Sequence, residues 1–150
     1  MEFLKDLMHN RIFLAAACGW IAAQVLKTIV HMWFNRRFVA ERLIGSGGMP
    51  SSHSATVCAL ATAAGIECGG GSYEFALAGI LAVIVMYDAM GVRRETGIQA
   101  RVLNEMMEIL TTMGRKMSVE EKLKEFVGHT PIQVLMGALL GILIGVLMYL

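Results

Sequence analysis

Residues 45–53 read Gly45-Ser-Gly-Gly-Met-Pro-Ser-Ser-His53, a glycine-rich turn followed by a proline, two hydroxyls and a histidine. The residues that follow, 55–66, are small and apolar, so we expect a helix here with Pro50 at its first helical position. The first turn of a helix leaves backbone N–H groups unpaired and carries the positive end of the helix dipole. The stretch therefore predicts a helix N-terminus that binds an anion, above all a phosphate.

Long apolar segments lie on both sides of this stretch. Of the 150 residues, 56% are hydrophobic and 17% are charged, and the mean hydropathy is +0.60. Residues 12–34 hold one formal charge, residues 75–92 hold one and residues 131–150 hold none. About 20 apolar residues span a bilayer, and the first segment is too long and lacks the cleavage site of a signal peptide. We therefore expect an integral membrane protein.

The expected fold is all-α: one domain, 1–150, built as a membrane helical bundle with three to four embedded helices and cytoplasmic interfacial helices. The short segment 55–66 would be a short or tilted helix buried among the others, because its small residues suit close packing. Gly137, Gly141 and Gly145 give the last segment a small-residue face. That face could pack within the subunit or form a homodimer, which the small number of spans favours.

Charge predicts the topology. Basic residues follow the first span at Arg36, Arg37 and Arg42 and gather again between residues 93 and 124, whereas the turn 67–74 has none. The positive-inside rule places both basic loops in the cytoplasm. Four polar clusters would then meet on one membrane face at the depth of lipid headgroups: Arg36/Arg37, 50–53, Arg93/Arg94 and 128–131.

The stretch 97–127 has a helical pattern. Ile98, Val102 and Met106 recur near the helical period, and Ser118 with Glu121 forms a capping box that would open a second short helix. We expect two connectors with one face on the core or the headgroups. The alternative is a lid over the anion site.

Four motifs stand out: Gly-Gly-Met-Pro-Ser-Ser-His-Ser-Ala (47–55), Tyr-Asp-Ala-x-Gly-Val-Arg-Arg (87–94), Gln-Ala-x-Val-Leu-Asn (99–104) and Leu-Lys-Glu-x-x-Gly-His-Thr-Pro (123–131). Together they resemble the motifs of a known family, the divergent branch of the type 2 phosphatidic acid phosphatases. The resemblance extends over nearly the whole chain, from Gln24 to Gly145. The parent superfamily also includes bacterial acid phosphatases and vanadium haloperoxidases.

The resemblance implies a mechanism. The parental motifs are Lys-x6-Arg-Pro, Pro-Ser-Gly-His and Ser-Arg-x5-His-x3-Asp. Their basic residues and backbone amides hold the phosphate, the second-motif histidine protonates the leaving oxygen, and the third-motif histidine attacks phosphorus while the acid orients it. A neutral imidazole is nucleophilic near pH 7, and cations stabilise the charge on transferring phosphoryl oxygens. No metal or other cofactor is needed in this scheme.

The resemblance assigns phosphate-binding residues position by position. Lys27 matches the first lysine, and Arg36 or Arg37 matches its arginine at a longer spacing and without the proline. The second motif matches residues 50–53, with Ser52 in place of glycine. Arg93 or Arg94 matches the third-motif arginine. The resulting phosphate-binding set is Lys27, Arg36, Arg37, Gly48, Ser51, Ser52, Arg93 and Arg94.

The catalytic residues follow from the same comparison. His53 matches the general acid, and His129 matches the nucleophile through His129-Thr-Pro-Ile-Gln133, about thirty residues further from the arginine than in the parent. Gln133 takes the position of the orienting acid. Its carbonyl can fix the tautomer of an imidazole, but it has no charge to stabilise an imidazolium.

Simpler interpretations remain open for each of these residues. Both histidines could be helix-cap residues, Lys27 could extend to the interface, and Arg93 and Arg94 could be membrane anchors. Gln24, Thr28, His31 and Asn35 form a polar stripe with Lys27, of a kind that usually faces a bundle interior. Asp88 could pair with the arginines, or it could join Asn104 and Glu105 in a divalent-metal site.

The sequence therefore favours a membrane phosphatase that hydrolyses a lipid phosphate or pyrophosphate headgroup through a phosphohistidine. It would act on a phospholipid or isoprenoid phosphate at the cytoplasmic face of a bacterial cytoplasmic membrane. The alternative is a non-catalytic lipid-phosphate-binding or scaffold protein that retains the anion site. The net charge of +1 argues against nucleic acid as a partner, and the three cysteines have no CxxC spacing.

Overall fold

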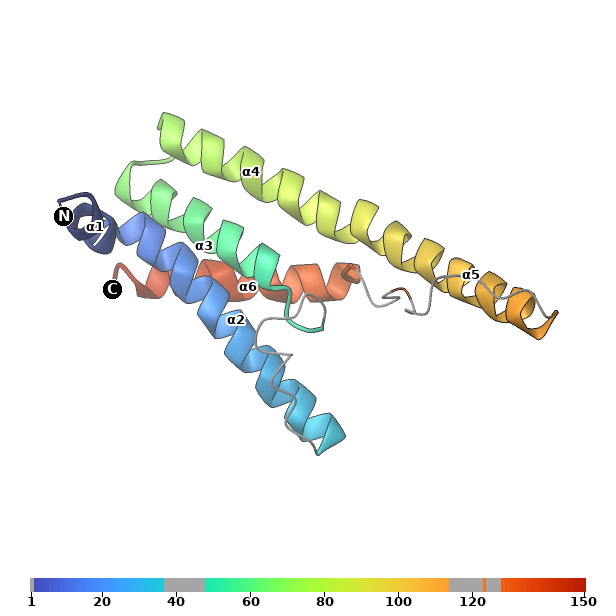
Figure 1. Cartoon of the computed structure of the whole chain (residues 1–150). Coiled ribbons are helices and arrows are strands. Elements are labelled where there is room, and N and C mark those ends of the chain that lie inside the picture. The colour runs from blue at the N-terminus through green and yellow to red at the C-terminus, as the bar shows by residue number, and fades with distance from the viewer. Residues whose placement is uncertain (1, 37–47, 114–122, 124–127) are drawn as a thin grey trace.

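The structure, a computed structural model, describes residues 2–36, 48–113, 123 and 128–150. In these residues the chain forms helices and no strand (Figure 1). The helices are α1 (Glu2–His9), α2 (Arg11–Asn35), α3 (Ser52–Glu67), α4 (Tyr73–Met90), α5 (Val92–Thr112) and α6 (Pro131–Leu147). The expected all-α class is confirmed.

Helix α3 lies at the centre of the bundle and contacts α2, α4 and α6. Its alanines at 55, 59, 63 and 64 are at most 1% exposed, because small side chains let neighbouring backbones approach closely. The predicted short, buried helix is therefore present, and it extends past the apolar segment 55–66 at both ends.

The small-residue face of α6 packs on α3 within the subunit. A Cβ at Gly137 would collide with the carbonyl of Ser51, and a Cβ at Gly141 would collide with that of Ala55. A Cβ at Gly145 would lie 2.7 Å from Cβ of Thr62. This face was predicted to pack either within the subunit or in a homodimer. It packs within the subunit, so it is not available to a second copy.

Ser51, rather than Pro50, sets the start of α3. The Ser51 hydroxyl accepts a hydrogen bond from the N–H of Ser54 at 3.4 Å, and the backbone at Ser51 is extended, as in an N-cap. The Ser51 N–H donates to the carbonyl of Gln133 on α6 at 3.0 Å, which holds this residue outside the helix. The prediction that Pro50 occupies the first helical position was therefore wrong, because Pro50 precedes the cap.

Helices α4 and α5 run nearly in line, with Gly91 as the single residue between them (Figure 1). Helix α5 thus begins at Val92, earlier than the predicted 97, and it extends away from the bundle. Its one helical neighbour among the described residues is α4, so it does not cover the start of α3. The predicted second helix with its Ser118–Glu121 cap lies outside the described residues.

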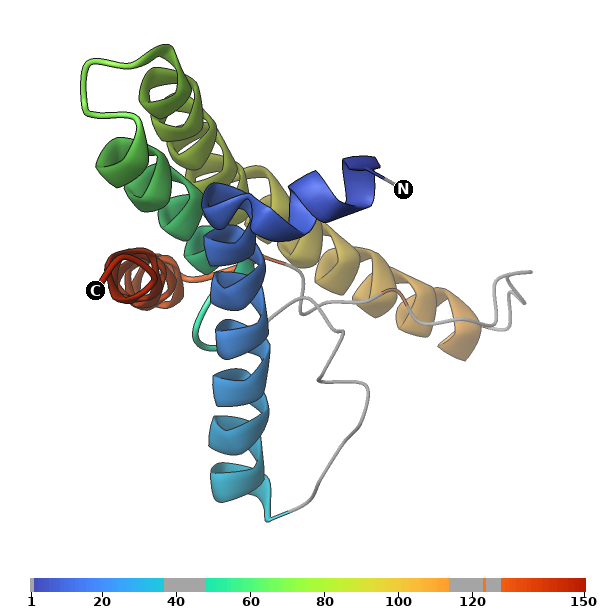
Figure 2. The same cartoon turned by 90° about the vertical axis from the view of Figure 1, so that its left-hand side faces the viewer.

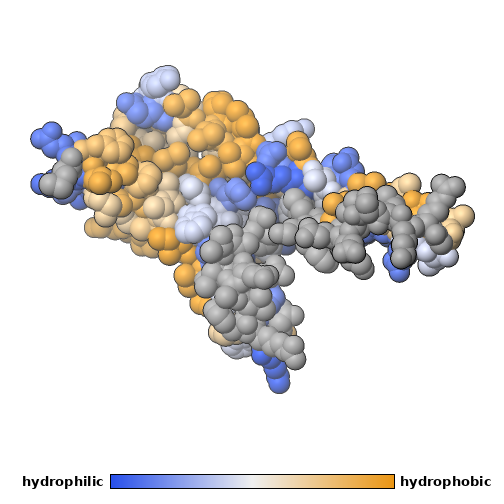
Figure 3. All heavy atoms as spheres, viewed as in Figure 1, coloured by the Kyte–Doolittle hydropathy of each residue, from blue (hydrophilic) through white to orange (hydrophobic). Residues whose placement is uncertain are grey.

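Two helical stretches are long and apolar enough to cross a membrane by length and composition: Arg11–Phe34, and Tyr73–Thr112 across α4 and α5. Helix α6 is a shorter apolar helix. The outer faces of α4 and α6 expose large hydrophobic side chains, among them Leu77, Ile80, Leu139 and Leu143. Figure 3 shows this apolar surface over the bundle and a hydrophilic patch where the bundle meets α5. The molecule is a membrane helical bundle, as expected.

The two ends of the bundle differ. At the end where α3 finishes and α4 begins, the Tyr149 hydroxyl donates to the Glu67 carboxylate, and the Arg11 guanidinium lies 5.8 Å from the centre of the Tyr149 ring. These contacts join α2, α3 and the residues after α6. Of the predicted anion-binding residues, Lys27, Gly48, Ser51, Ser52, Arg93 and Arg94 lie at the other end.

Candidate functional site

Three segments far apart in the sequence are held together by backbone contacts at the start of α3. Besides the bond from Ser51 to Gln133, the N–H of His129 donates to the carbonyl of Ala89 on α4 at 3.0 Å. Gly128 has φ +92° and lies against the backbone at the start of α5, where a Cβ on it would be 2.6 Å from Cα of Arg94. The ends of α4, α3 and α6 therefore converge on one point.

The two predicted catalytic histidines meet at this point. The ring centres of His53 and His129 are 6.0 Å apart, and the rings are oriented edge to face. His129 is 3% exposed, and His53 is partly exposed with a buried Nδ1 that has no hydrogen-bond partner among the described residues. One phosphate can contact both imidazoles at this separation.

Gln133 orients His129. Its Oε1 accepts a hydrogen bond from the N–H of Thr130 at 3.1 Å and lies 3.2 Å from Nδ1 of His129. Because an amide oxygen only accepts, Nδ1 must carry the proton in this contact, and Nε2 is left with the lone pair. Thr130 and Gln133 also form the capping box of α6, followed by Pro131 in the first turn. The start of α6 therefore sets the tautomer of His129.

The surroundings of His129 favour its neutral form. Burial lowers the pKa of His129 from its ordinary value of 6.5, and the positive charges of Lys27 and Arg93 lower it further, whereas the hydrogen bond to Gln133 raises it. Burial is the largest of these effects. These effects together favour the neutral imidazole, whose Nε2 is available to a ligand.

Two cations belong to the site. Lys27 is 2% exposed, and its side chain passes beside Gly48, where a Cβ would lie 3.4 Å from the lysine Cγ. Gly48 has φ +86°, a backbone conformation that favours glycine. Arg93 lies near enough to act electrostatically on His129, whereas Arg94 lies with its backbone against Gly128. Of the predicted arginine pair, Arg93 is the one at the histidines.

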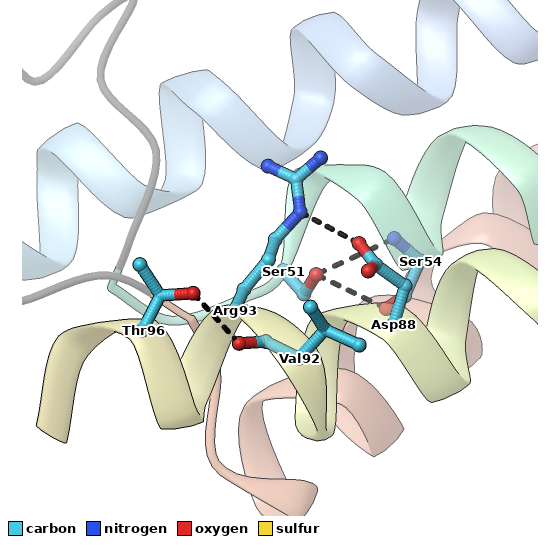
Figure 4. A network of polar contacts seen from close by, with 6 residues as sticks. All are labelled: Ser51, Ser54, Asp88, Val92, Arg93 and Thr96. Atoms are coloured by element: carbon cyan, nitrogen blue, oxygen red, sulfur yellow. Dashed lines mark hydrogen bonds and ion pairs between the residues drawn. The ribbon is translucent and has the colours of Figure 1, made fainter. Parts of the chain in front are cut away.

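Asp88 holds Arg93 in place. Nε of Arg93 donates to Oδ2 of Asp88 at 2.7 Å across the joint between α4 and α5. Figure 4 shows the two terminal nitrogens of Arg93 pointing away from this carboxylate. A guanidinium held through Nε keeps both terminal groups for an oxyanion. Of the two interpretations of Asp88, an ion pair with an arginine or a metal ligand, the structure shows the ion pair.

The serines have different roles. Ser51 is fully buried, and its hydroxyl oxygen accepts from the hydroxyl of Ser54 at 3.0 Å as well as from the Ser54 N–H, so it serves the helix cap. Ser52 is buried in the first turn of α3. Among the described residues, the N–H groups of Ser52 and His53 have no hydrogen-bond acceptor. These two donors are available to an anion.

The predicted Arg36 is not brought to the histidines. Arg36 ends α2 nine residues after Lys27, about 14 Å further along the axis at 1.5 Å per residue. Figures 1 and 2 both show this part of α2 leaving the bundle. Arg37 lies outside the described residues.

The side chains of the alternative metal site, Asp88, Asn104 and Glu105, do not lie together. Asp88 is paired with Arg93, and the side-chain amide of Asn104 bonds both the N–H and the carbonyl of Leu123. Asn104 and Glu105 lie on α5, more than 20 Å from Asp88 at about 1.5 Å per residue. The part of the chain that the structure describes contains no group of three His, Cys, Asp or Glu side chains that could hold a metal.

Gly128 and Ser54 were missing from the predicted set. The sequence had a signal for Gly128, because it immediately precedes His129 within a motif. Ser54 also lies within a motif, 47–55, but its burial and its bond to Ser51 depend on the packing of α3.

Comparison with known proteins identifies the family. A family model described as "Divergent PAP2 family" matches residues 8–144. The chain belongs to this divergent PAP2 family. The match includes all four residues that converge, Lys27, His53, Arg93 and His129. The resemblance seen in the motifs is thus confirmed.

A relative supports the membrane assignment. Over 148 residues the chain is 38% identical to "Uncharacterized membrane protein YuiD" of Bacillus subtilis (strain 168), covering 93% of this chain and 94% of that protein. No solved structure matches the chain. This member of the divergent PAP2 family is accordingly a membrane protein.

Proposed function

We propose that this protein is a membrane phosphatase that hydrolyses a lipid phosphate or pyrophosphate headgroup through a phosphohistidine intermediate. The observation that carries the proposal is the pair His53 and His129, 6.0 Å apart, with Nδ1 of His129 against the Gln133 carbonyl. A buried imidazole with a fixed tautomer and an open Nε2 has the properties of a nucleophile. Membership of the divergent PAP2 family supports the same reaction class.

The reaction has two steps. Nε2 of His129 forms a bond to phosphorus as the bond from phosphorus to the lipid oxygen breaks, and His53 gives that oxygen a proton. Water then attacks phosphorus, His53 takes the proton from the water, the P–N bond breaks and inorganic phosphate leaves. Since a bound phosphate is anionic, its arrival favours the protonated form of His53 that the first step needs.

Charge on the transferring group is stabilised from several sides. Lys27 contributes an ammonium, Arg93 contributes its terminal N–H groups, and Ser52 and His53 contribute backbone N–H groups at the positive end of α3. Asp88 touches Arg93 and acts as a positioning residue. Because Asp88 pairs with Arg93 and Lys27 is buried, we expect little reorganisation of these groups in the transition state.

Charge also supports a cytoplasmic position for the site. Arg93, Arg94 and Arg101 lie at or beyond the site end of the bundle, whereas Glu67 and Glu74 lie near the opposite end. The positive-inside rule favours the cytoplasm for the basic end. The substrate would then be a lipid of the inner leaflet.

Phosphate release in one detergent tests the proposal, with phosphatidic acid, phosphatidylglycerophosphate and isoprenoid phosphates as substrates. Wild type should release phosphate from at least one of them, and His129→Ala should be slower by about 10³-fold or more. His9→Ala, on exposed α1, is the matched control and should equal wild type. Vanadate should inhibit, a chelator should not, and labelled substrate should leave acid-labile phosphate on wild type alone.

Gln133 in place of an acid favours a second candidate, a lipid-phosphate-binding or scaffold protein without turnover. An amide orients His129 but does not stabilise an imidazolium. Wild type that releases no phosphate from the whole panel, while anionic-lipid binding survives His129→Ala, would establish this candidate and refute the phosphatase.

A further inference from the structure

One side of α3 is left open by its neighbours. Helices α2, α4 and α6 each contact α3, and α6 also contacts both α2 and α4, but α2 and α4 do not contact each other. Both helices fall wholly within the described residues. The side of α3 that faces away from α6 is therefore not closed by a helix–helix contact.

Three residues lie along that side, beginning at the catalytic end. His53, Thr56 and Leu60 follow the helical spacing of one face, about half a turn around α3 from the residues that meet the glycines of α6. All three are partly exposed, whereas Ala55 and Ala59, which pack on α6 and α2, are fully buried. We name these three residues the open face of α3.

The open face changes from polar to apolar within about 10 Å, at 1.5 Å per residue. Its first residue, His53, lies beside His129 at the candidate phosphate site. The hydroxyl of Thr56 donates to the carbonyl of Ser52 at 2.7 Å, so it needs no outside partner. Beyond it lies Leu60, a partly exposed hydrocarbon side chain about two turns into α3.

We propose that the open face of α3 binds the hydrocarbon chain of the lipid whose phosphate contacts His53 and His129. The proposal rests on the proposed function and adds the basis of its substrate choice: the chain lies between α2 and α4, along Thr56 and Leu60. Continuity with the phosphate site identifies the occupant, because a molecule that reaches both must have a phosphate at one end and hydrocarbon at the other. The lipid therefore enters sideways from its own leaflet.

The variant Leu60→Trp tests this proposal, because its larger side chain leaves less room for a hydrocarbon chain along the open face. Two substrates are compared in the same mixed micelles: dioleoyl phosphatidic acid, which has long chains, and p-nitrophenyl phosphate, which has none. The ratio of kcat/KM on the lipid to kcat/KM on the aryl phosphate should fall by about tenfold or more, since hydrophobic contacts of this size give discrimination of that order. Thr56→Phe, one turn closer to His53, should lower the same ratio.

Leu139→Trp is the matched control, because Leu139 lies on α6 and is 52% exposed. It should keep the wild-type ratio. The proposal is overturned if the ratio in Leu60→Trp and Thr56→Phe equals that of the control, or if both substrates lose activity in equal proportion. If wild type hydrolyses another lipid of the panel but not phosphatidic acid, that lipid takes its place in the ratio. If wild type releases phosphate from no lipid of the panel, the proposed function itself fails and the chain-binding role fails with it.

Discussion

At the scale of single residues, one carbonyl oxygen links helix capping to the candidate chemistry. Oε1 of Gln133 caps α6 through the N–H of Thr130 and orients His129 through Nδ1. A capping box accepts Glu as readily as Gln at this position. A carboxylate would keep both hydrogen bonds and would add the charge that an imidazolium prefers.

Gln133→Glu should therefore leave the rate of phosphate release unchanged or raise it, whereas Gln133→Leu, which loses the acceptor, should lower kcat by about 10²-fold or more. Steady-state kinetics on the best lipid phosphate of the panel measure both. A large loss of activity in Gln133→Glu would contradict the role given to this side chain.

The lowered pKa of His129 makes folding sensitive to pH. Because the folded pKa lies below the ordinary 6.5, the unfolded chain takes up the proton first as the pH falls. The neutral, buried ring therefore stabilises the fold above pH 6.5, and this contribution is lost as the pH falls below it. Tm of the detergent-purified protein should fall between pH 7.5 and 5.5, and the fall should be smaller in His129→Gln. Identical slopes in the two proteins would refute this.

Asp88 should affect substrate binding more than the chemical step. In Asp88→Ala, Arg93 loses the partner of its Nε, and KM for a lipid phosphate should rise by roughly tenfold, while Asp88→Asn retains an acceptor and should recover part of the loss. The exposed Glu108 on α5 provides a control, Glu108→Ala, that should leave KM unchanged. A loss in kcat alone would argue against a positioning role.

At the scale of helices, α3 and α6 pack through close contact of their backbones and not through large side chains. Gly141 is the centre of the α3–α6 interface, where any Cβ meets the carbonyl of Ala55. A Cβ added to Gly79 on α4 would have nothing within 4 Å. The two glycines therefore differ in surroundings but share a helical backbone.

Gly141→Ala should therefore lower the free energy of unfolding by roughly 1–3 kcal/mol through overpacking. Gly79→Ala should leave stability unchanged or raise it by up to about 1 kcal/mol, since alanine favours helix. Denaturation in a single detergent compares the two. Equal changes in the free energy of unfolding would mean that the α3–α6 interface has room for a Cβ at Gly141.

The sequence predicted the elements better than their ends. Apolar length and the family motifs were enough to place the helices and to bring His53, Lys27, Arg93 and His129 to one end of the bundle. Where α3 begins depended on a bond from Ser51 to a carbonyl on α6, which no local pattern contains. The motif spacing also could not show that α2 continues straight past Lys27 and takes Arg36 away from the site.

At the scale of the whole molecule, the bundle has a basic end with the candidate site and an opposite end that joins Arg11, Glu67 and Tyr149. This polarity predicts the orientation in the membrane, which can be measured with thiols, one of them already in the chain. Cys68 is exposed in the turn after α3, at the end opposite to the site.

A membrane-impermeant maleimide should label Cys68 in intact cells, and Cys68→Ser should abolish that labelling. Thr112→Cys, introduced at the exposed end of α5 in the Cys68→Ser background, should react after the membrane is permeabilised and not before. The reverse pattern would place the site outside the cytoplasm and would contradict the positive-inside assignment.

The dependence of the site on α6 has a consequence for biosynthesis. His129 and the carbonyl of Gln133 that anchors Ser51 are translated after Lys27 and His53. A nascent chain in which α6 has not yet been made thus contains Lys27 and His53 but lacks His129 and the carbonyl that bonds Ser51. The two histidines therefore come together only when α6 packs on α3.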